Sequence, residues 1–192
     1  MMVAMDIDAL LKRFPALQRD EKSDAVIAPC DIVMEVAEFL KKDSGYELDY
    51  LSNVSGVDYL PKEEKEELKK EEGEVETKIK EIPGYMEVVY HFYSMKNKGG
   101  LFVLKQRLMD RESPVAMSLM PLYRSAEFQE REVYDLFGIK FTGHPDLRRL
   151  FMWEEFEDFP LRKDYKEPDD YEYEPTAHDT VLEKSEANKS NK

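Results

Sequence analysis

Residues 130–150, EREVYDLFGIKFTGHPDLRRL, carry the densest group of side chains in the chain that could do chemistry. Glu130 or Glu132 could act as a general base, with His144 as its partner in proton transfer. The same three side chains are of types that bind transition metals. The Glu-x-Glu spacing, however, places the two carboxylates about 200° apart around a helix, so that they point away from each other. Because a shared proton or metal needs convergent groups, the spacing disfavours both a catalytic site and a metal site.

The helix that would position these groups is predicted over residues 125–137, SAEFQEREVYDLF. Ser125 is a residue type that caps helix N-termini. Gly138 is the type that most often ends a helix, because it adopts the left-handed conformation without strain. These two residues therefore set the expected limits of the helix.

A charged stripe is predicted along the same helix. Glu127, Arg131 and Asp135 recur every four residues, which predicts an acid–base–acid ladder on one face. Apolar residues flank the ladder, so the helix is part ionic and part apolar. An ion-paired structural helix is thus the alternative to an active site.

The segment that follows is predicted to turn into another helix. His144 precedes Pro145, which holds it in an extended conformation. Pro145 suits the first turn of a helix, and Asp146 complements the positive helix N-terminus. Arg148 and Arg149 then present two guanidinium groups in an acidic protein. We expect them to make specific ionic contacts with a neighbouring protein.

Composition excludes several classes of function. The chain has 192 residues and a net charge of −14, so binding to DNA or RNA without help is not expected. A single cysteine, Cys30, excludes an internal disulfide and any four-cysteine zinc or iron–sulfur site made by this chain alone. No apolar run approaches the length of a membrane span, and the first residues lack the layout of a signal peptide. We expect a protein of the cytosol or of the cytosolic face of a membrane.

Residues outside the central segment offer little chemistry. The chain lacks the glycine-rich phosphate-binding and nucleophile-elbow motifs. His91 lies in an apolar stretch and is expected to be a satisfied core residue, whereas His178 lies near the C-terminus. Trp153 is expected to pack or to anchor an interface. Cys30 is expected to be a small, half-buried residue beside a helix cap.

The remaining pattern predicts alternating short elements. Asp31 is the expected N-cap of the second helix, and Gly56 marks a possible bulge. Residues 61–82 are mostly charged and are interpreted as a surface insertion, with a solvated helix in the first half and an exposed strand in the second. Helices are predicted at about 8–14 and 32–42, and strands at 24–29, 47–60, 86–95, 101–108 and 139–141.

Four blocks, in order, carry a resemblance to a known family: ERE, DLFG, GHPDLRR and PLRKDY. They resemble the signature of the 30-kDa subunit family of respiratory complex I, which serves NADH:quinone oxidoreductases and their hydrogenase relatives. The stretches LSNVSGVDY and VVYHFYSMKNKGGLFVLKQRL also resemble this family, and the resemblance covers roughly residues 30–165. The family usually has Trp where this chain has Phe128, which keeps an aromatic side chain.

The resemblance implies an α+β fold, with a small mixed or antiparallel sheet and helices packed on it. It assigns residues 1–165 to one domain of the 30-kDa type with the charged insertion 61–82, and we expect 166–192 to form an extended acidic tail. It implies no catalytic residue, no metal and no cofactor in this chain. The residues that match its signature, and would contact partner proteins, are Glu130, Arg131, Glu132, Tyr134, Asp135, Gly138, His144, Pro145, Asp146, Arg148, Arg149, Arg162, Lys163 and Asp164.

The partners that the resemblance implies are a hydrogenase-like large subunit, an iron–sulfur small subunit, other peripheral-arm subunits and, through the complex, a membrane arm. A nickel–iron centre and iron–sulfur clusters are expected in those partners. The chain has 26 Glu but only 4 Asn and 3 Gln, which is typical of thermophiles. With the charged insertion, this favours an archaeal, ferredoxin-dependent, hydrogen-evolving membrane-bound hydrogenase. NADH-, deazaflavin- or sulfur-linked complexes are the alternative, and a free-standing carboxylate-dependent enzyme is the alternative of another class.

Overall fold

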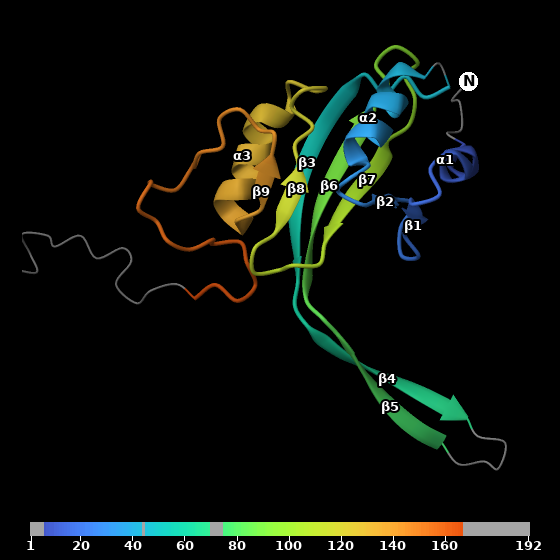
Figure 1. Ribbon diagram of the computed structural model, residues 1–192, viewed down its shortest axis with the longest axis vertical. Helices are drawn as coiled ribbons and strands as arrows, with labels where there is room; N and C mark the ends of the chain where they lie inside the picture. The colour runs from blue at the N-terminus through green and yellow to red at the C-terminus, as the bar shows by residue number, and fades with distance from the viewer. Residues whose placement is uncertain (1–5, 44, 70–74, 167–192) are drawn as a thin grey trace, which may run out of the picture.

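The computed structural model describes residues 6–43, 45–69 and 75–166 (Figure 1). The predicted acidic tail lies outside these residues, except for its first position. The helices are α1 (Ile7–Arg13), α2 (Val33–Lys42) and α3 (Ala126–Phe137). The strands are β1 (Gln18–Arg19), β2 (Val26–Ala28), β3 (Tyr50–Tyr59), β4 (Lys62–Lys69), β5 (Val75–Ile82), β6 (Tyr85–Tyr93), β7 (Phe102–Leu108), β8 (Val115–Met117) and β9 (Lys140–Thr142).

A five-stranded mixed sheet forms the centre of the molecule, in the order β1-β2-β7-β6-β3. Strands β2 and β7 are parallel, and the other neighbouring strands are antiparallel. Helices α2 and α3 lie on one face of this sheet, over its two halves (Figure 1). The α+β fold with helices packed on a small mixed sheet is therefore confirmed, and β6 is a central strand as predicted.

The two faces of β6 have different surroundings because side chains alternate along a strand. Met86, Val88, Tyr90 and Phe92 are fully buried in the core beneath the helices. On the opposite face, His91 is half-buried and its Nδ1 atom has no hydrogen-bond partner in the part of the chain that the structure describes. The prediction of a satisfied core histidine is therefore wrong for that nitrogen.

A buried glutamine joins the small β8–β9 pair to the main sheet. Gln106 Nε2 donates to Tyr90 Oη at 2.7 Å and to the carbonyl of Met117 at 3.0 Å. Gln106 Oε1 accepts the backbone N–H of Met117 at 3.0 Å. Because every polar atom of this amide is paired, burying it costs little free energy and fixes the register of β8.

Helix α3 covers the exposed edge of β3. Gln129 Oε1 accepts the N–H of Val54 at 2.6 Å, and Ser125 Oγ donates to the carbonyl of Leu51 at 2.9 Å. Ser125 does precede the helix, but its hydroxyl is used here and does not cap it. At Gly56, an added Cβ would lie 2.6 Å from the ring of Phe137, so only glycine permits this close approach.

Two local predictions are wrong near the sheet. Helix α2 begins after Ile32, not after Asp31, and no side chain caps its first turn. The irregularity in β3 lies between Leu51 and Asn53, whereas Gly56 stays in regular register. At Gly56, tertiary packing explains the difference, because the ring of Phe137 on α3 lies against this position.

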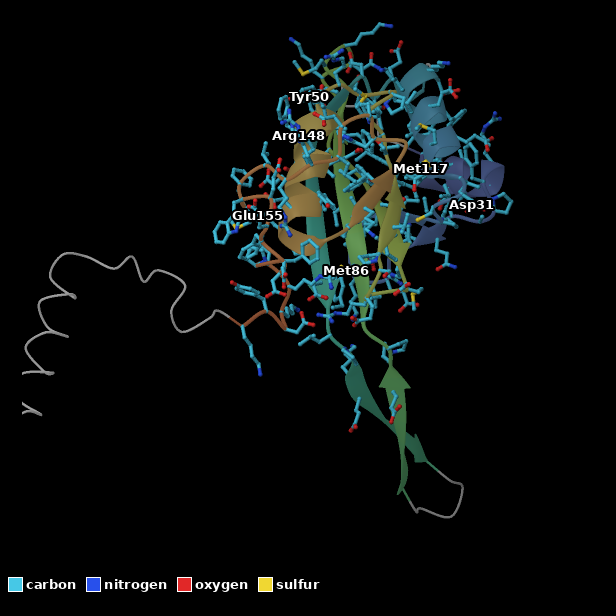
Figure 2. All side chains as sticks on the ribbon, turned by 60° about the vertical axis from the view of Figure 1, so that its left-hand side comes forward. Asp31, Tyr50, Met86, Met117, Arg148 and Glu155 are labelled. Atoms are coloured by element: carbon cyan, nitrogen blue, oxygen red, sulfur yellow. The ribbon has the colours of Figure 1, made fainter. Side chains whose placement is uncertain are left out.

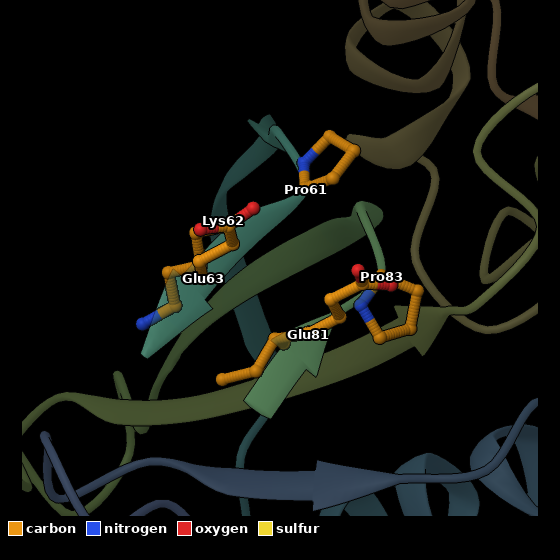
Figure 3. Close-up of a pocket in the computed structure, with 6 residues that line it drawn as sticks. Pro61, Lys62, Glu63, Glu81 and Pro83 are labelled. Atoms are coloured by element: carbon orange, nitrogen blue, oxygen red, sulfur yellow. The ribbon is translucent and has the colours of Figure 1, made fainter. Parts of the chain in front are cut away.

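The charged segment forms a two-stranded ribbon, β4–β5, that projects beyond the main sheet (Figure 1). The predicted helix over its first half is wrong, whereas the predicted strand over its second half is confirmed. Helical Glu and Lys spacing was overridden by antiparallel pairing, because β3 and β6 already hold the two chain segments side by side. Pro61 and Pro83 stand at the base of the ribbon (Figure 3).

The insertion interpretation predicts that the domain folds without the ribbon. Tyr59 and Tyr85 are register partners, so replacing residues 60–84 by Asn-Gly should close β3 and β6 with a two-residue turn. The free energy of unfolding should change by no more than about 1 kcal/mol, since the ribbon adds no strand to the five-stranded sheet. Urea denaturation followed by circular dichroism measures this, and loss of the cooperative transition would contradict the interpretation.

Candidate functional site

The carboxylate of Asp135 organises the signature segment. It is fully buried on α3, and its Oδ2 accepts three consecutive backbone N–H groups, from Leu150 at 2.9 Å, Phe151 at 2.6 Å and Met152 at 3.0 Å. Burial opposes the charged form, but these three bonds and the guanidinium of Arg149 outweigh it and lower the pKa of Asp135. One charged side chain therefore fixes the path of the loop after β9.

Arg149 returns the contact from the loop to the helix. Its Nη1 lies 2.8 Å from Asp135 Oδ1, and its Nη2 donates to the carbonyls of Phe156 and Asp158. The guanidinium also lies over the ring of Phe159, 5.2 Å from its centroid. With a side chain only 11% exposed, Arg149 is used inside this chain.

Arg131 and His144 hold the first part of the same loop. Arg131 donates to the carbonyls of Arg148 at 3.2 Å and Arg149 at 3.3 Å. His144 Nδ1 accepts the N–H of Asp146, so its Nε2 carries the proton and donates to the carbonyl of Glu127 at 3.0 Å. The loop is therefore bonded to α3 through backbone groups at several points.

Two sequence predictions for this region are wrong. Arg131 makes neither ion pair of the predicted ladder within the described residues, because Glu127 approaches Arg124 and Asp135 binds Arg149. The stretch after Pro145 is an irregular loop and not a helix. Its backbone N–H groups bond to Asp135 instead of forming helical bonds, which explains the difference.

Glu130 attaches the other side of α3 to the core. It is fully buried, and its carboxylate accepts hydrogen bonds from Ser118 Oγ at 2.6 Å and from the N–H of Leu119 at 2.7 Å. Burial raises the pKa of Glu130 to about 7, although both hydrogen bonds favour the charged form. Glu132 is exposed, so the predicted divergence of the two carboxylates is confirmed.

The PLRKDY block folds back onto the end of β3. Asp58 is buried, forms two bonds with Arg111 at 2.7 and 2.8 Å, and accepts the N–H of Lys163 at 2.8 Å. Arg111 also bonds to Asp164, and it holds the pKa of that carboxyl below its usual range. Arg162 donates to the carbonyl of Phe137 at 2.7 Å. Sequence reasoning missed Asp58 and Arg111, because no local pattern links residues so far apart.

The structure brings the signature residues together around α3 but divides them by exposure. Of this set, the buried residues are Glu130, Arg131, Asp135 and Gly138. The half-buried ones are Tyr134, His144, Arg149 and Arg162. The exposed ones are Glu132, Pro145, Asp146, Arg148, Lys163 and Asp164. Gly138 adopts a left-handed conformation with φ of 75° and ends α3 as predicted.

Large apolar side chains are exposed on and beside the clamped loop, which is the irregular segment 143–165 that α3 and β3 hold in place. Phe128 on α3 is 58% exposed, and Phe151, Trp153 and Leu161 on the loop are 60%, 53% and 52% exposed. We call these four residues the aromatic patch. Arg148, whose side chain is 67% exposed, belongs to the same loop and lies beside α3 (Figure 2). Such exposed aromatic residues with a nearby arginine are typical of protein interfaces.

The arrangement offers no convergent reactive groups. Among the described residues, no group of three or more His, Cys, Asp or Glu side chains could hold a metal ion. Cys30 is half-buried as predicted, and its Sγ lies 3.4 Å from the carbonyl of Val115. Each buried acid of the signature is occupied by donors from its own chain. The site is therefore a loop held in place by ion pairs, with apolar side chains directed outward.

The fold and the site together define an α+β domain with a mixed sheet and a loop that is held by buried acids and carries exposed aromatic side chains. Residues 26–172 match the family model described as respiratory-chain NADH dehydrogenase, 30 Kd subunit. The chain belongs to this family.

Similar proteins agree with this assignment. The C 2 subunit of the NADH-quinone oxidoreductase of Rhizobium meliloti is 40% identical over 141 residues, covering 73% of this chain and 65% of the relative. The C 2 subunit from Rhizobium etli is 34% identical, covering 84% and 79%. A solved fragment of Nqo5 matches with a TM-score of 0.50 and 26% identity over 73% of this chain and 98% of that one. One chain in the structure of an archaeal respiratory membrane complex, the membrane-bound sulfane sulfur reductase, shares the fold, with a TM-score of 0.59, 19% identity and 83% coverage of both chains.

The raised pKa of Glu130 predicts a dependence of stability on pH. The folded state binds this proton more tightly than the unfolded chain, so its contribution is present below the ordinary pKa of 4.5 and is lost as pH rises to about 7. Glu130→Gln should make stability less dependent on pH across this window, by about 2–4 kcal/mol. Urea denaturation between these pH values measures the effect. Glu132→Gln, on the exposed face, is the control and should leave the slope unchanged.

The Asp135–Arg149 pair predicts strong coupling. Asp135→Asn would turn an amide N–H₂ toward groups that all donate, so it should lower the free energy of unfolding by about 3–5 kcal/mol at neutral pH. Because the pKa of Asp135 is lowered, the wild-type contribution should persist until pH falls below the ordinary 3.8. A double-mutant cycle with Arg149→Ala measures the coupling, and Arg148→Ala is the exposed control. Additive effects would contradict the clamp.

Proposed function

We propose that this chain is a non-catalytic structural subunit of a complex I-like oxidoreductase and docks its hydrogenase-like large subunit through the aromatic patch. The observation that carries the proposal is the combination of an internally clamped loop with exposed aromatic side chains on it. Fixing the loop in advance reduces the conformational entropy that binding would otherwise cost. The signature residues thus support docking mostly by shaping the loop.

The two adjacent arginines have different roles in this proposal. Arg149 stays with Asp135, whereas Arg148 lies at the surface, where only Asp146 binds it within the described chain, at 2.9 Å. Arg148 can therefore pair with a carboxylate of the large subunit without breaking the clamp. Truncating one member of such a buried pair typically costs about 2–5 kcal/mol of binding.

The proposed location is the cytoplasmic face of the membrane, within the peripheral arm of the complex. Among the described residues, no helix combines the length and apolar character needed to cross a bilayer. Membrane attachment would come through the partner subunits, with an iron–sulfur small subunit and the membrane arm completing the assembly. The nickel–iron centre and iron–sulfur clusters would reside in those partners.

For the complex itself, composition favours ferredoxin-dependent hydrogen evolution, whereas the curated relatives favour an NADH-quinone oxidoreductase. The two complexes differ in the partner subunits and their cofactors and not in this chain's clamps. Purifying the tagged chain with its native partners and identifying them by mass spectrometry distinguishes them. Activity of the isolated chain would instead support the free-standing enzyme.

Docking is tested by disrupting the patch without touching the clamp. Phe151→Ser with Trp153→Ser should reduce recovery of the large subunit with the tagged chain by about tenfold or more, since anchor residues dominate interfaces. The variant should remain folded, and turnover per assembled complex should stay unchanged. Arg148→Ala should weaken recovery in the same direction.

The matched control is Met95→Ser with Leu101→Ser, which removes two apolar side chains of similar exposure, 60% and 58%, at the β6–β7 turn. This variant should assemble normally. Equal loss from the control would show that surface hydrophobicity alone matters. Full assembly of the patch variant with slow turnover would show that the patch acts on chemistry, which would overturn the proposal.

A further inference from the structure

The ribbon and the main sheet share one hairpin register. Tyr59 is the partner of Tyr85 at the end of β3–β6, and Lys62 is the partner of Ile82 at the start of β4–β5. Two residues lie between these pairs on each strand, so neither strand carries an extra residue and the register does not shift. Nevertheless the strands stop on the sheet side and begin again on the ribbon side. Something other than a register shift must interrupt the ladder.

The hydrogen-bond pattern identifies the interruption. Residues of an antiparallel strand direct their backbone groups alternately toward the partner strand and away from it. Val54 donates its N–H to Gln129, so its backbone groups face away from β6, and the odd-numbered residues of β3 from Asn53 onward face toward β6. The last bonded pair before the ribbon is therefore Tyr59 with Tyr85.

The next bonded pair in this register would be Pro61 with Pro83. Proline has no backbone N–H, so neither bond of that pair can form. The two prolines stand opposite each other at the base of the ribbon (Figure 3). A single proline would remove one bond, but two opposed prolines remove the whole pair. The ladder between ribbon and sheet therefore lacks both backbone hydrogen bonds at the Pro61–Pro83 pair.

The end of β3–β6 next to the proline pair is held in place by side-chain contacts. The rings of Tyr59 and Tyr85 stack at 4.5 Å, and the guanidinium of Arg107 lies 4.9 Å from the Tyr85 centroid. At Gly84, an added Cβ would lie 2.9 Å from Pro61 Cδ and 3.0 Å from Arg111 Cδ, so the two segments of the hairpin lie very close together here. Any change of direction is therefore confined to the short links on either side of the prolines.

The ribbon side has its own strand pairing. Within the part of the chain that the structure describes, strands β4 and β5 form a separate two-stranded sheet and pair with no other strand. Gly84 adds conformational freedom to one link, because it has no side chain to restrict its dihedral angles. The proline rings fix only φ, which leaves ψ of both prolines as a soft angle. The links can therefore bend without breaking any ladder bond.

We propose that Leu60–Pro61 and Pro83–Gly84 form a hinge about which the β4–β5 ribbon swings as one body relative to the five-stranded sheet. The hinge lets the ribbon take its direction from whichever neighbour it meets. Restoring the missing donors should remove the swing. The double variant Pro61→Thr with Pro83→Val returns both N–H groups and uses residues that favour strands.

The test measures distances between spin labels by pulsed electron resonance, in a Cys30→Ser background. The ribbon–body pair has one label at Thr77→Cys on β5 and one at Glu35→Cys on α2, and it measures the distance between the ribbon and the rest of the domain, which we call the body. The body pair has its labels at Glu35→Cys and Glu112→Cys, both exposed, and it measures a distance within the body alone. The ribbon–body distribution should be broad in the native hinge, and in the proline-free variant it should narrow to the width of the body pair.

Each outcome decides the proposal. A native ribbon–body distribution as narrow as that of the body pair would mean a fixed arm and would overturn it. Equal broad distributions with and without the prolines would show that the missing bonds are not the cause, which also overturns it. Circular dichroism and thermal unfolding confirm that the proline-free variant is folded. The single variants Pro61→Thr and Pro83→Val, each restoring one donor, should give intermediate widths.

Discussion

The signature region depends on one constraint: the buried carboxylate of Asp135 needs hydrogen-bond donors. Asp135 is fully buried on α3, and a charge in that position is tolerated only when it is paired and hydrogen-bonded. The chain meets this demand with three consecutive N–H groups and one guanidinium. Satisfying the acid therefore requires the loop after β9 to take one path, and that path fixes which of its side chains face outward.

The same logic recurs at two other places. Glu130 binds α3 to the segment after β8, and Asp58 binds the PLRKDY block to the end of β3 through Arg111. Asp135 and Asp58 attach the irregular segment after β9 to the helix and the sheet, and Glu130 attaches the same helix to the segment after β8. Residues that look like an active site thus act as internal connections. The large apolar side chains that stay exposed around this segment suit the proposed role in assembly.

Much of the architecture followed from local sequence. Strand-favouring apolar residues determined β6 and β7, the 3.6-residue period determined α2 and α3, and Gly138 determined where α3 ends. The divergence of Glu130 and Glu132 followed from helix geometry alone. The order of the signature blocks determined the family. These features depend on neighbouring residues, so the sequence is sufficient to predict them.

The tertiary structure alone decided what each charge binds. Arg131 bonds to carbonyls and not to its helical neighbours, and Arg149 binds Asp135. The charged segment is a ribbon and not a helix, because β3 and β6 deliver its two ends side by side. Asp58 and Arg111, 53 residues apart, leave no local trace. The reason is common to all of these. A charge takes the partner that folding places nearest, whereas helix and strand periods are set within a few residues of each position.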